Sequence, residues 1–431
     1  MSDAQQQVEL RRDPLRDMLA TVLKSTIATQ YGEIPLSVGL NSGDEQVFGR
    51  AIMHLGRMGN EVRDLLVKDN RFPGDAVLQM RSEAGSSNLY PNMVGVPLLR
   101  RVLRTGSPDE AIEWLCRMLV TKDAPGKTIE ALWGVSVEAE VQLLPDLKIV
   151  PIEQLPDSSQ KRLLMNSGHP RSQALLMTML DYVPPKSALV ANRVLKSVIY
   201  DPAVAQADDS KEMKRTDDLL ADVTLVLTLV GPRVPISAVI WFEFDDPDLQ
   251  QLGPLAGMRR SRGLEILPAV PTDYLPLDAT EAQELLHRFF ALDEGTKQKI
   301  RLSLHRLNIA QRRRGLGDRA VELCVALETL LGGPDNNEVT HKVTVRSALL
   351  LGGGGTARLE NADVVKRTYG FRSTLVHQGK EPTGTKEING VKTQVVDIVD
   401  RAVNVCVAVI KVIIRRGKIP DWTTFDLEDH A

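Results

Sequence analysis

The pair of side chains best suited to chemistry in this chain is Arg372 and His377, which are separated by four residues. A histidine gains or loses a proton near neutral pH, and an arginine carries a permanent planar charge that suits a phosphate. Of the seven histidines, only His377 follows an arginine at this distance. A two-residue pattern is weak by itself, but this pair could cleave RNA without a metal ion.

Three segments around this pair occur in a characteristic order and spacing, at residues 319–331, 342–352 and 369–377. Together they resemble the HEPN superfamily, in its ApeA-like branch, over about residues 280–417. The resemblance implies a small helical bundle that dimerises and places two arginine–histidine motifs across one cleft. It also implies a ribonuclease of a toxin or anti-phage system, such as an abortive-infection effector.

The resemblance leaves a second function open, because in some members the motif has decayed and the domain only binds. A non-catalytic HEPN-like module would bind RNA, a nucleotide or a partner protein. The intact Arg372 and His377 favour the enzyme. Such an enzyme would stay inactive until a phage-derived or cellular trigger acts on the N-terminal regions.

The reaction expected of this pair is transesterification within RNA. His377 would take a proton from the ribose 2′-hydroxyl or donate one to the 5′-leaving oxygen, while Arg372 stabilises charge on the phosphate. The expected ends are a 2′,3′-cyclic phosphate and a 5′-hydroxyl. DNA lacks the attacking group and should survive.

The motif lies near the end of a helix predicted over about residues 359–377, with Gly379 as its stop. At roughly 100° per residue, Arg372 lies roughly 140° around the axis from His377 and about 7.5 Å below it. One helix does not easily bring the two groups together, whereas a two-fold partner can supply the second group. The sequence therefore predicts a homodimer.

Three further side chains are candidates for supporting roles. Ser373 is expected either to bond the histidine or phosphate, or to lie on an exposed surface. Tyr369 would stack on a base or fill the seam of the bundle, and we favour packing. Glu328 lies on an otherwise apolar helix, so we expect it to be paired, with Arg346 or Arg372 as partner.

Four other patterns favour structural interpretations. Gly126-Lys127-Thr128 lacks the preceding glycine and strand of a phosphate-binding loop and is predicted to start a helix. The acidic residues 245–248 resemble a turn after a strand, and the glycines 352–355 a turn between helices. Arg301 and His305 fit a solvated helix face. We therefore expect neither a metal site nor a cofactor.

The overall charge places any RNA site in a local basic region. The formal net charge is only -3, although residues 312–314 and 411–418 form basic clusters. Either cluster could hold RNA backbone or simply complement a helix C-terminus.

The cysteine pattern and the absence of targeting signals indicate a cytoplasmic protein. The three cysteines offer neither a disulfide framework nor a zinc spacing. The apolar residues 403–414 are too few to span a bilayer, and the N-terminus has no signal-peptide pattern, so we expect no membrane partner.

The predicted fold class is α+β, with four regions. A mostly helical region at 1–133 precedes a mixed α/β region at 134–276 that would sense a trigger or regulate. An all-α, HEPN-like bundle at 277–420 and an acidic, peripheral or disordered tail at 421–431 follow.

Local patterns predict several elements within these regions. Strands are expected at 223–230 and 234–244, joined as a hairpin through Gly231, and a connecting loop at 85–96. Thr280 should cap the first bundle helix. A last helix from about 391 to 414 is expected despite its strand-like composition.

Overall fold

The computed structural model describes residues 13–30, 32–72, 77–82, 85–165, 184–204, 210–231, 234–252, 259–260, 276–333, 338–428 and 430. The chain divides into two compact units. Unit 1 combines residues 1–128, 192–213 and 241–260, and unit 2 combines 129–191, 214–240 and 261–431. Each unit is thus built from three separate stretches of sequence. The predicted division into four continuous regions stays a prediction.

Unit 1 encloses its own core between helices and short strands. Ser107 caps the start of α6, where its hydroxyl accepts a hydrogen bond from the Glu110 amide at 3.2 Å. α4 buries Leu55 and Val62 on one stripe. The elements are α2 (Pro14–Leu23), β1 (Thr26–Thr29), β2 (Gly32–Pro35), α3 (Leu36–Gly39), α4 (Glu45–Leu66), β3 (Leu78–Ser82), β4 (Gly85–Leu89), α5 (Pro91–Thr105), α6 (Pro108–Leu119), β9 (Ile199–Tyr200) and α9 (Pro247–Leu252).

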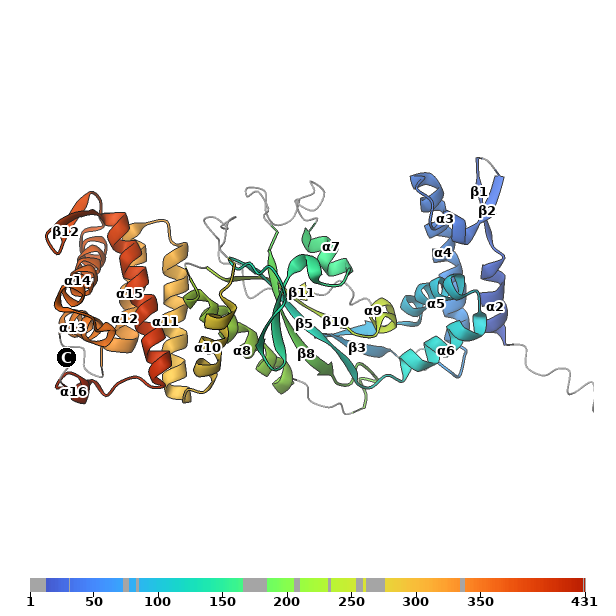
Figure 1. Ribbon diagram of the computed structural model, residues 1–431. Helices are drawn as coiled ribbons and strands as arrows, with labels where there is room; N and C mark the ends of the chain where they lie inside the picture. The colour runs from blue at the N-terminus through green and yellow to red at the C-terminus, as the bar shows by residue number, and fades with distance from the viewer. Residues whose placement is uncertain are drawn as a thin grey trace, which may run out of the picture. The chain divides into compact units, whose positions relative to one another are not determined.

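A six-stranded sheet has the strand order β11-β10-β5-β8-β7-β6. Figure 1 labels β5, β8, β10 and β11 of this sheet. Neighbours β6, β7 and β8 are antiparallel, and Ile149 pairs with Leu189. The strands are β5 (Ala124–Trp133), β6 (Val141–Leu144), β7 (Leu147–Pro151), β8 (Ser187–Leu195), β10 (Ile236–Phe244) and β11 (Arg259–Arg260), and η1 (Ile152–Gln154) and α7 (Ser159–Met165) follow β7. Helices together with several sheets confirm the predicted α+β class.

The local structures predicted for residues 223–230 and 85–96 are wrong. Residues 223–230, predicted as a strand, complete helix α8 (Ser210–Val226) and form the 3-10 turn η2 (Leu227–Leu229). Their apolar residues belong to a buried helical stripe, which β-branched composition alone does not distinguish from a strand. Residues 85–96, predicted as a loop, form β4 and the start of α5, where Pro91 occupies the first turn. The expected strand at 234–244 is confirmed by β10.

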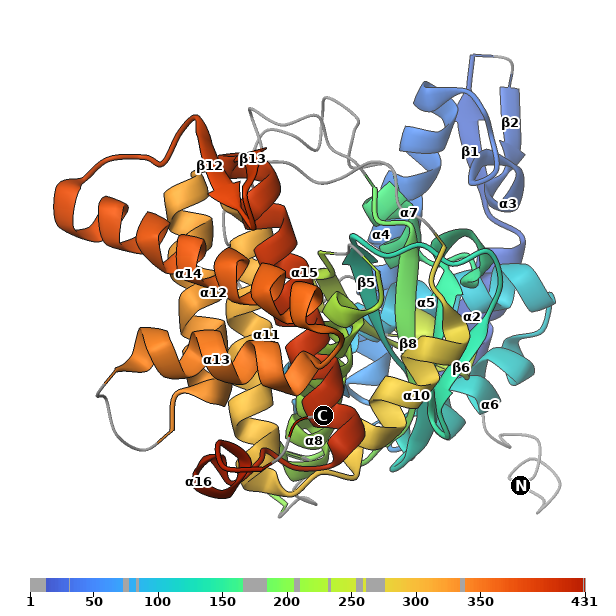
Figure 2. The same ribbon diagram turned by 60° about the vertical axis from the view of Figure 1, so that its left-hand side comes forward.

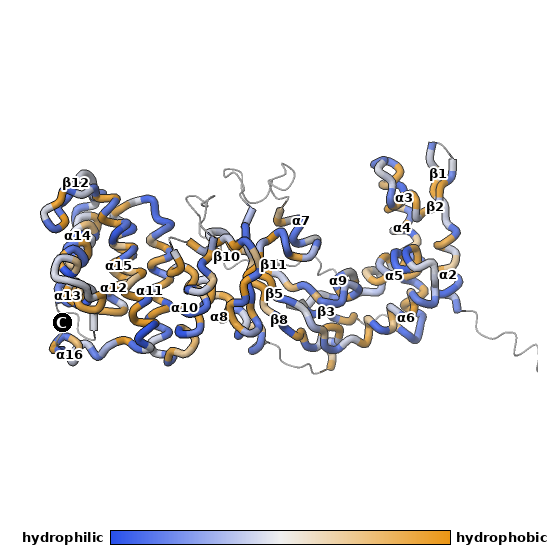
Figure 3. Tube along the Cα trace, in the orientation of Figure 1, coloured by the Kyte–Doolittle hydropathy of each residue, from blue (hydrophilic) through white to orange (hydrophobic). Residues whose placement is uncertain are grey.

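The C-terminal part of unit 2 is the predicted helical bundle. In Figure 2, α13 and α14 lie side by side and cross α12, which packs along α11. The buried stripe of α11 includes Ile300, Leu304 and Leu307, as the spacing predicts. Figure 3 shows hydrophobic stretches along these helices. The helices are α10 (Ala279–Phe290), α11 (Glu294–Arg312), α12 (Leu316–Leu331), α13 (Val339–Leu351), α14 (Gly355–Gln378) and α15 (Val395–Arg416).

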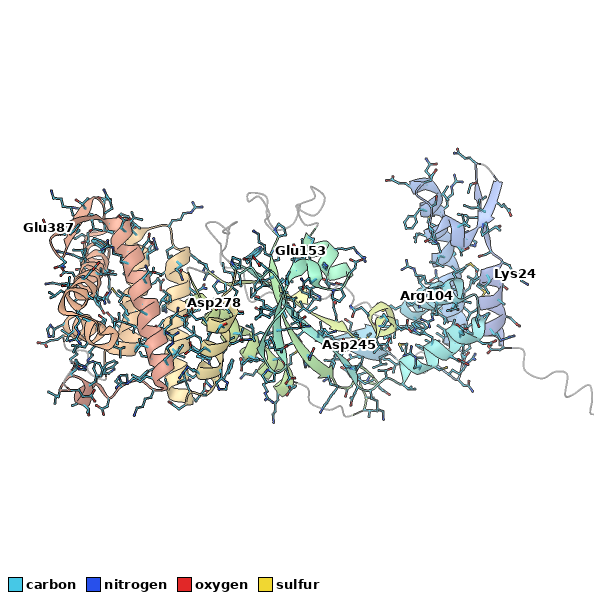
Figure 4. All side chains as sticks on the ribbon, in the orientation of Figure 1. Lys24, Arg104, Glu153, Asp245, Asp278 and Glu387 are labelled. Carbon is cyan, nitrogen blue, oxygen red and sulfur yellow. The ribbon has the colours of Figure 1, made fainter. Side chains whose placement is uncertain are left out.

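The first bundle helix is capped by Asp278 rather than by Thr280. The Asp278 carboxylate accepts a hydrogen bond from the Glu281 amide at 3.0 Å, and Figure 4 shows this residue at the start of α10. Aspartate is a strong N-cap and also complements the positive end of the helix dipole. Thr280 therefore lies within the first turn.

A β-hairpin interrupts the bundle, which was predicted to be all-α. β12 (Thr385–Ile388) and β13 (Val391–Gln394) pair antiparallel around Asn389-Gly390. These two residues have φ angles of 49° and 78°, which fit the tight type I′ turn that Asn-Gly favours. Because β13 takes residues 391–394, α15 begins at Val395. The long buried helix predicted after that point is confirmed.

The acidic tail is packed rather than peripheral over residues 421–428 and 430, the part that the structure describes. α16 (Trp422–Phe425) buries both of its aromatic side chains in the core of unit 2. The Trp422 indole Nε1 donates to the Leu330 carbonyl in α12 at 3.1 Å. Aromatic burial therefore decides the position of this segment, despite its net negative charge.

Native protein is expected to react with a thiol reagent at one of its three cysteines. Cys324 and Cys406 are buried, and burial raises the pKa of both thiols, that of Cys406 to about 12. The thiolate is the nucleophile, so at about pH 8 only the half-buried Cys116 should react quickly. DTNB should release one equivalent of chromophore in buffer and three in denaturant. A Cys116→Ser variant that still reacts rapidly in buffer would contradict this burial.

Candidate functional site

Helix α14 carries the candidate pair and ends where the sequence predicts. Gly379 has a φ of 63°, and its amide donates to the Leu375 carbonyl at 2.9 Å, which closes the helix in a left-handed cap. His377 therefore lies in the last turn of α14.

Two neighbours hold the Arg372 guanidinium within one chain. Its Nη1 donates to Glu328 Oε1 at 3.3 Å, and its Cζ lies 5.9 Å from the centroid of the Tyr369 ring. The Arg372 side chain is 39% exposed, so solvent screens this ion pair, and we assign it a positioning effect rather than a large contribution to stability. Glu328 uses one of the five N–H donors of the guanidinium.

Tyr369 lies in the core of the bundle and is only 5% exposed. Burial raises the pKa of its hydroxyl well above the usual range, and the adjoining Cys324 and Glu328 add to this effect. Of the two roles predicted for this ring, packing between helices describes its position. Stacking on a base would require an exposed face.

Glu328 is paired, and its partner is Arg372 rather than Arg346. Its side chain is 26% exposed on α12. Arg346 instead pairs with Asp426, with Nη2 to Oδ2 at 2.7 Å. The contact between Glu328 and Arg372 therefore ties α12 to the motif helix α14.

His377 and Ser373 are exposed on α14. Neither side chain makes a hydrogen bond or an ion pair with any residue in the described part of the chain. The predicted bond between Ser373 and the histidine is thus absent within one described chain. Arg372 and His377 likewise do not pair with each other there, as expected for residues roughly 140° apart on a helix. In one chain, therefore, Glu328 holds the Arg372 guanidinium, and the His377 imidazole is exposed to solvent.

The last turn of α14 packs against the N-terminal end of α12. A Cβ added at Gly317 would lie 3.0 Å from Leu375 Cδ2, so this close approach suits a glycine. The Gly317 amide donates to Glu381 Oε2 at 2.9 Å, which caps α12 from the segment that follows α14. The connection between α11 and α12 therefore lies beside the turn that carries His377.

Gly126-Lys127-Thr128 lies inside strand β5 and does not start a helix, so the predicted helix-start turn is wrong. A Cβ at Gly126 would lie 2.3 Å from Phe242 Cζ, which explains the glycine by close packing. Lys127 Nζ pairs with Asp245 Oδ1 at 2.7 Å. The structural interpretation of this segment holds, although its local conformation differs from the expected one.

The acidic residues 245–248 form ion pairs with arginines of unit 1. Arg117 contacts Asp246 at 2.8 Å and Asp248 at 2.9 Å, and Arg101 contacts Asp248 at 2.7 Å. Since basic side chains meet these carboxylates, the segment has the structural role favoured from the sequence. In the described ranges, no three histidine, cysteine or carboxylate side chains gather as a metal ligand set.

The competing pair Arg301 and His305 does not form a simple solvated face. Arg301 Nε and Nη2 donate to the two carboxylate oxygens of Asp222, at 2.7 and 2.8 Å, and Asp222 is buried. Arg301 is thus committed to a structural pair. His305 is exposed.

Two features of this region were missed from the sequence. The Asn389-Gly390 hairpin was signalled by its own dipeptide, flanked by short runs of β-forming residues. The anchoring of Arg346 by Asp426 had no local signal, because the two lie 80 positions apart.

Comparisons with protein-family models, with curated proteins and with solved structures find no match to this chain. A search of the helices in the described residues finds none that is long and apolar enough to cross a bilayer.

Proposed function

We propose that this protein is a metal-independent endoribonuclease of HEPN type that acts as a homodimer. One observation carries the proposal: a single helix holds Arg372 against Glu328 and presents His377 to solvent in its last turn. The guanidinium is a permanent cation for a phosphate, and an imidazole can accept or donate a proton. These are the two groups that RNA transesterification requires.

In the proposed reaction, an imidazole nitrogen of His377 accepts the proton of a ribose 2′-hydroxyl. The 2′-oxygen then attacks the adjacent phosphorus, and the bond to the 5′-oxygen breaks as that oxygen takes up a proton. Arg372 stabilises negative charge on the non-bridging oxygens. The products are a 2′,3′-cyclic phosphate and a 5′-hydroxyl end.

The exposed side chains of α14 support a second copy of the chain as partner. Val376 and Leu359 on this helix are 59% and 62% exposed. Val376 immediately precedes His377, so a partner that covered it would approach the imidazole. A two-fold axis there would bring the Arg372 of one chain toward the His377 of the other, which one helix cannot do alone.

The Arg372–Glu328 pair also favours a second function, a non-catalytic module that binds RNA, a nucleotide or a partner protein. In one chain the carboxylate already partly neutralises the guanidinium. A phosphate group would displace Glu328 and bind without being cleaved. Phosphate binding in the absence of any cleavage would distinguish this function from the nuclease.

The protein is expected to cleave labelled RNA in the presence of EDTA and to leave DNA of the same sequence intact. The reason is that the attacking group is the 2′-hydroxyl, which DNA lacks. Gel electrophoresis measures the cleavage, and resistance of the new 3′ end to labelling until the cyclic phosphate is removed identifies the chemistry. Cleavage of DNA, or RNA cleavage that EDTA abolishes, would contradict the proposed mechanism.

A further inference from the structure

The connection between α11 and α12 gathers arginines on the surface of unit 2. Residues 312–314 are three consecutive arginines, and Arg313 and Arg314 are exposed. Arg306 lies nearly two turns before them on α11 and belongs to the same group, because it shares a carboxylate with Arg313. We refer to Arg306 and residues 312–314 as the arginine corner.

A buried carboxylate holds two members of the arginine corner in place. Glu322 is only 10% exposed; its Oε2 accepts from Arg306 Nη1 at 3.1 Å and its Oε1 from Arg313 Nη2 at 3.2 Å. The two arginine side chains are 37% and 52% exposed, so the cations reach solvent while the anion beneath them does not. Fixing guanidinium groups in this way lowers the entropy lost when they bind a phosphate.

The arginine corner lies beside the turn that carries His377. Arg314 precedes Gly317 by three residues, which is at most roughly 11 Å along the chain, and Gly317 packs against Leu375. His377 lies two residues beyond Leu375, a rise of about 3 Å on α14. The amide of Gly317 is already bonded to Glu381, so the arginine side chains, rather than the helix end, are the groups offered to an anion.

We infer that Arg313 and Arg314 bind the phosphate backbone of the RNA substrate and lead the strand to His377. The identity of the polyanion rests on the proposed function. The whole chain has a formal charge of -3, so this local cluster supplies an attraction that the molecule as a whole lacks. Backbone contacts position a strand without reading its bases, so binding at this corner is independent of RNA sequence.

A 2′-O-methyl RNA oligonucleotide separates this inference from cleavage, because it lacks the attacking hydroxyl. The full chain is titrated with the labelled oligonucleotide, and fluorescence anisotropy gives Kd over a range of salt concentrations. The double variant Arg313→Gln/Arg314→Gln should lower the slope of log K against log salt by about 1.4, since each single-strand phosphate contact contributes about 0.7. At about 0.1 M salt the same relation predicts a Kd about 25-fold higher.

Lys299→Gln/Lys24→Gln is the matched control, because it removes the same charge from two exposed positions outside both basic clusters. Lys299 lies about 20 Å from Arg312 along α11, and Lys24 ends helix α2 in unit 1. The Kd of this control variant should stay within about twofold of the wild-type value, since charges beyond a Debye length are largely screened. Thermal melts of both variants show that each is folded.

Three results would overturn the inference. The wild type could fail to bind the oligonucleotide, or the control variant could lose as much affinity as the arginine variant. Polyglutamate could also displace the oligonucleotide as effectively as RNA does at the same concentration of negative charge. If only the arginine variant loses binding and the wild type never cleaves RNA, the RNA-binding role of the arginine corner is supported and the nuclease function is rejected. If the wild type cleaves RNA and the arginine variant binds the oligonucleotide with unchanged Kd, only the role of the arginine corner is rejected.

Discussion

Replacing His377 with alanine is expected to lower the rate of RNA cleavage by about 10²–10⁴-fold, the contribution of a positioned general acid or base. The imidazole is exposed and makes no hydrogen bond or ion pair within the described residues, so the fold should not change. The contact between Arg372 and Glu328 is also retained, so RNA should still bind. Single-turnover cleavage of a labelled RNA in EDTA measures the rate, and a thermal melt verifies the fold.

His305→Ala is the matched control for this substitution. His305 is likewise an exposed histidine on a helix of the same unit, α11, and it lies outside the candidate site. The control should cleave RNA at the wild-type rate. Equal cleavage by wild type and by His377→Ala would remove the catalytic assignment and leave the binding module as the function.

Replacing Arg346 with alanine is expected to lower the free energy of unfolding of the bundle by about 3–5 kcal/mol, because each buried acceptor left without its donor costs about 1–3 kcal/mol and Arg346 serves two carbonyls. Its side chain is 7% exposed and donates to the carbonyls of Leu331 and Gly332, at 2.6 and 3.0 Å. It also pairs with Asp426 and lies over the Trp422 ring at 5.1 Å. Alanine would leave the carboxylate unpaired and the end of α12 without its donor.

Chemical denaturation followed by circular dichroism measures this loss, and the melting temperature should fall by about 6–20 °C. Arg401→Ala is the control, because Arg401 pairs with Glu360 between α15 and α14 at 2.8 Å, with both side chains almost half exposed. That pair should contribute about 1 kcal/mol or less. Similar midpoints for the two variants would show that Arg346 does not anchor the tail.

The bundle helices were predictable because their apolar residues recur every three or four positions and their ends carry glycine. Gly352, Gly379 and Gly417 each follow a helix where the sequence pattern stops. The same rule failed at residues 223–230, where a helical stripe made of valine and leucine has the composition of a strand. The order of strands in the central sheet depends on pairings between distant segments, for which local periodicity holds no information.

The candidate site was predictable as a helix face but not as a set of contacts. Helical geometry alone separates Arg372 from His377, and the structure agrees. Glu328 had two candidate partners in the sequence, and only tertiary packing chooses Arg372. The carboxylate beneath the arginine corner, Glu322, was not singled out, because an acidic residue in a helix has no local mark of burial.

The packing of α16 has a consequence for the order of events during synthesis. The ribosome makes Trp422 and Phe425 after all of α10–α15, yet these two rings complete the core of the bundle. A nascent chain or an interrupted translation product that stops before residue 421 therefore lacks the aromatic pair and the aspartate that anchor the end of α12. Under the proposed function, such a copy would also lack this support for α12, the helix that carries Glu328.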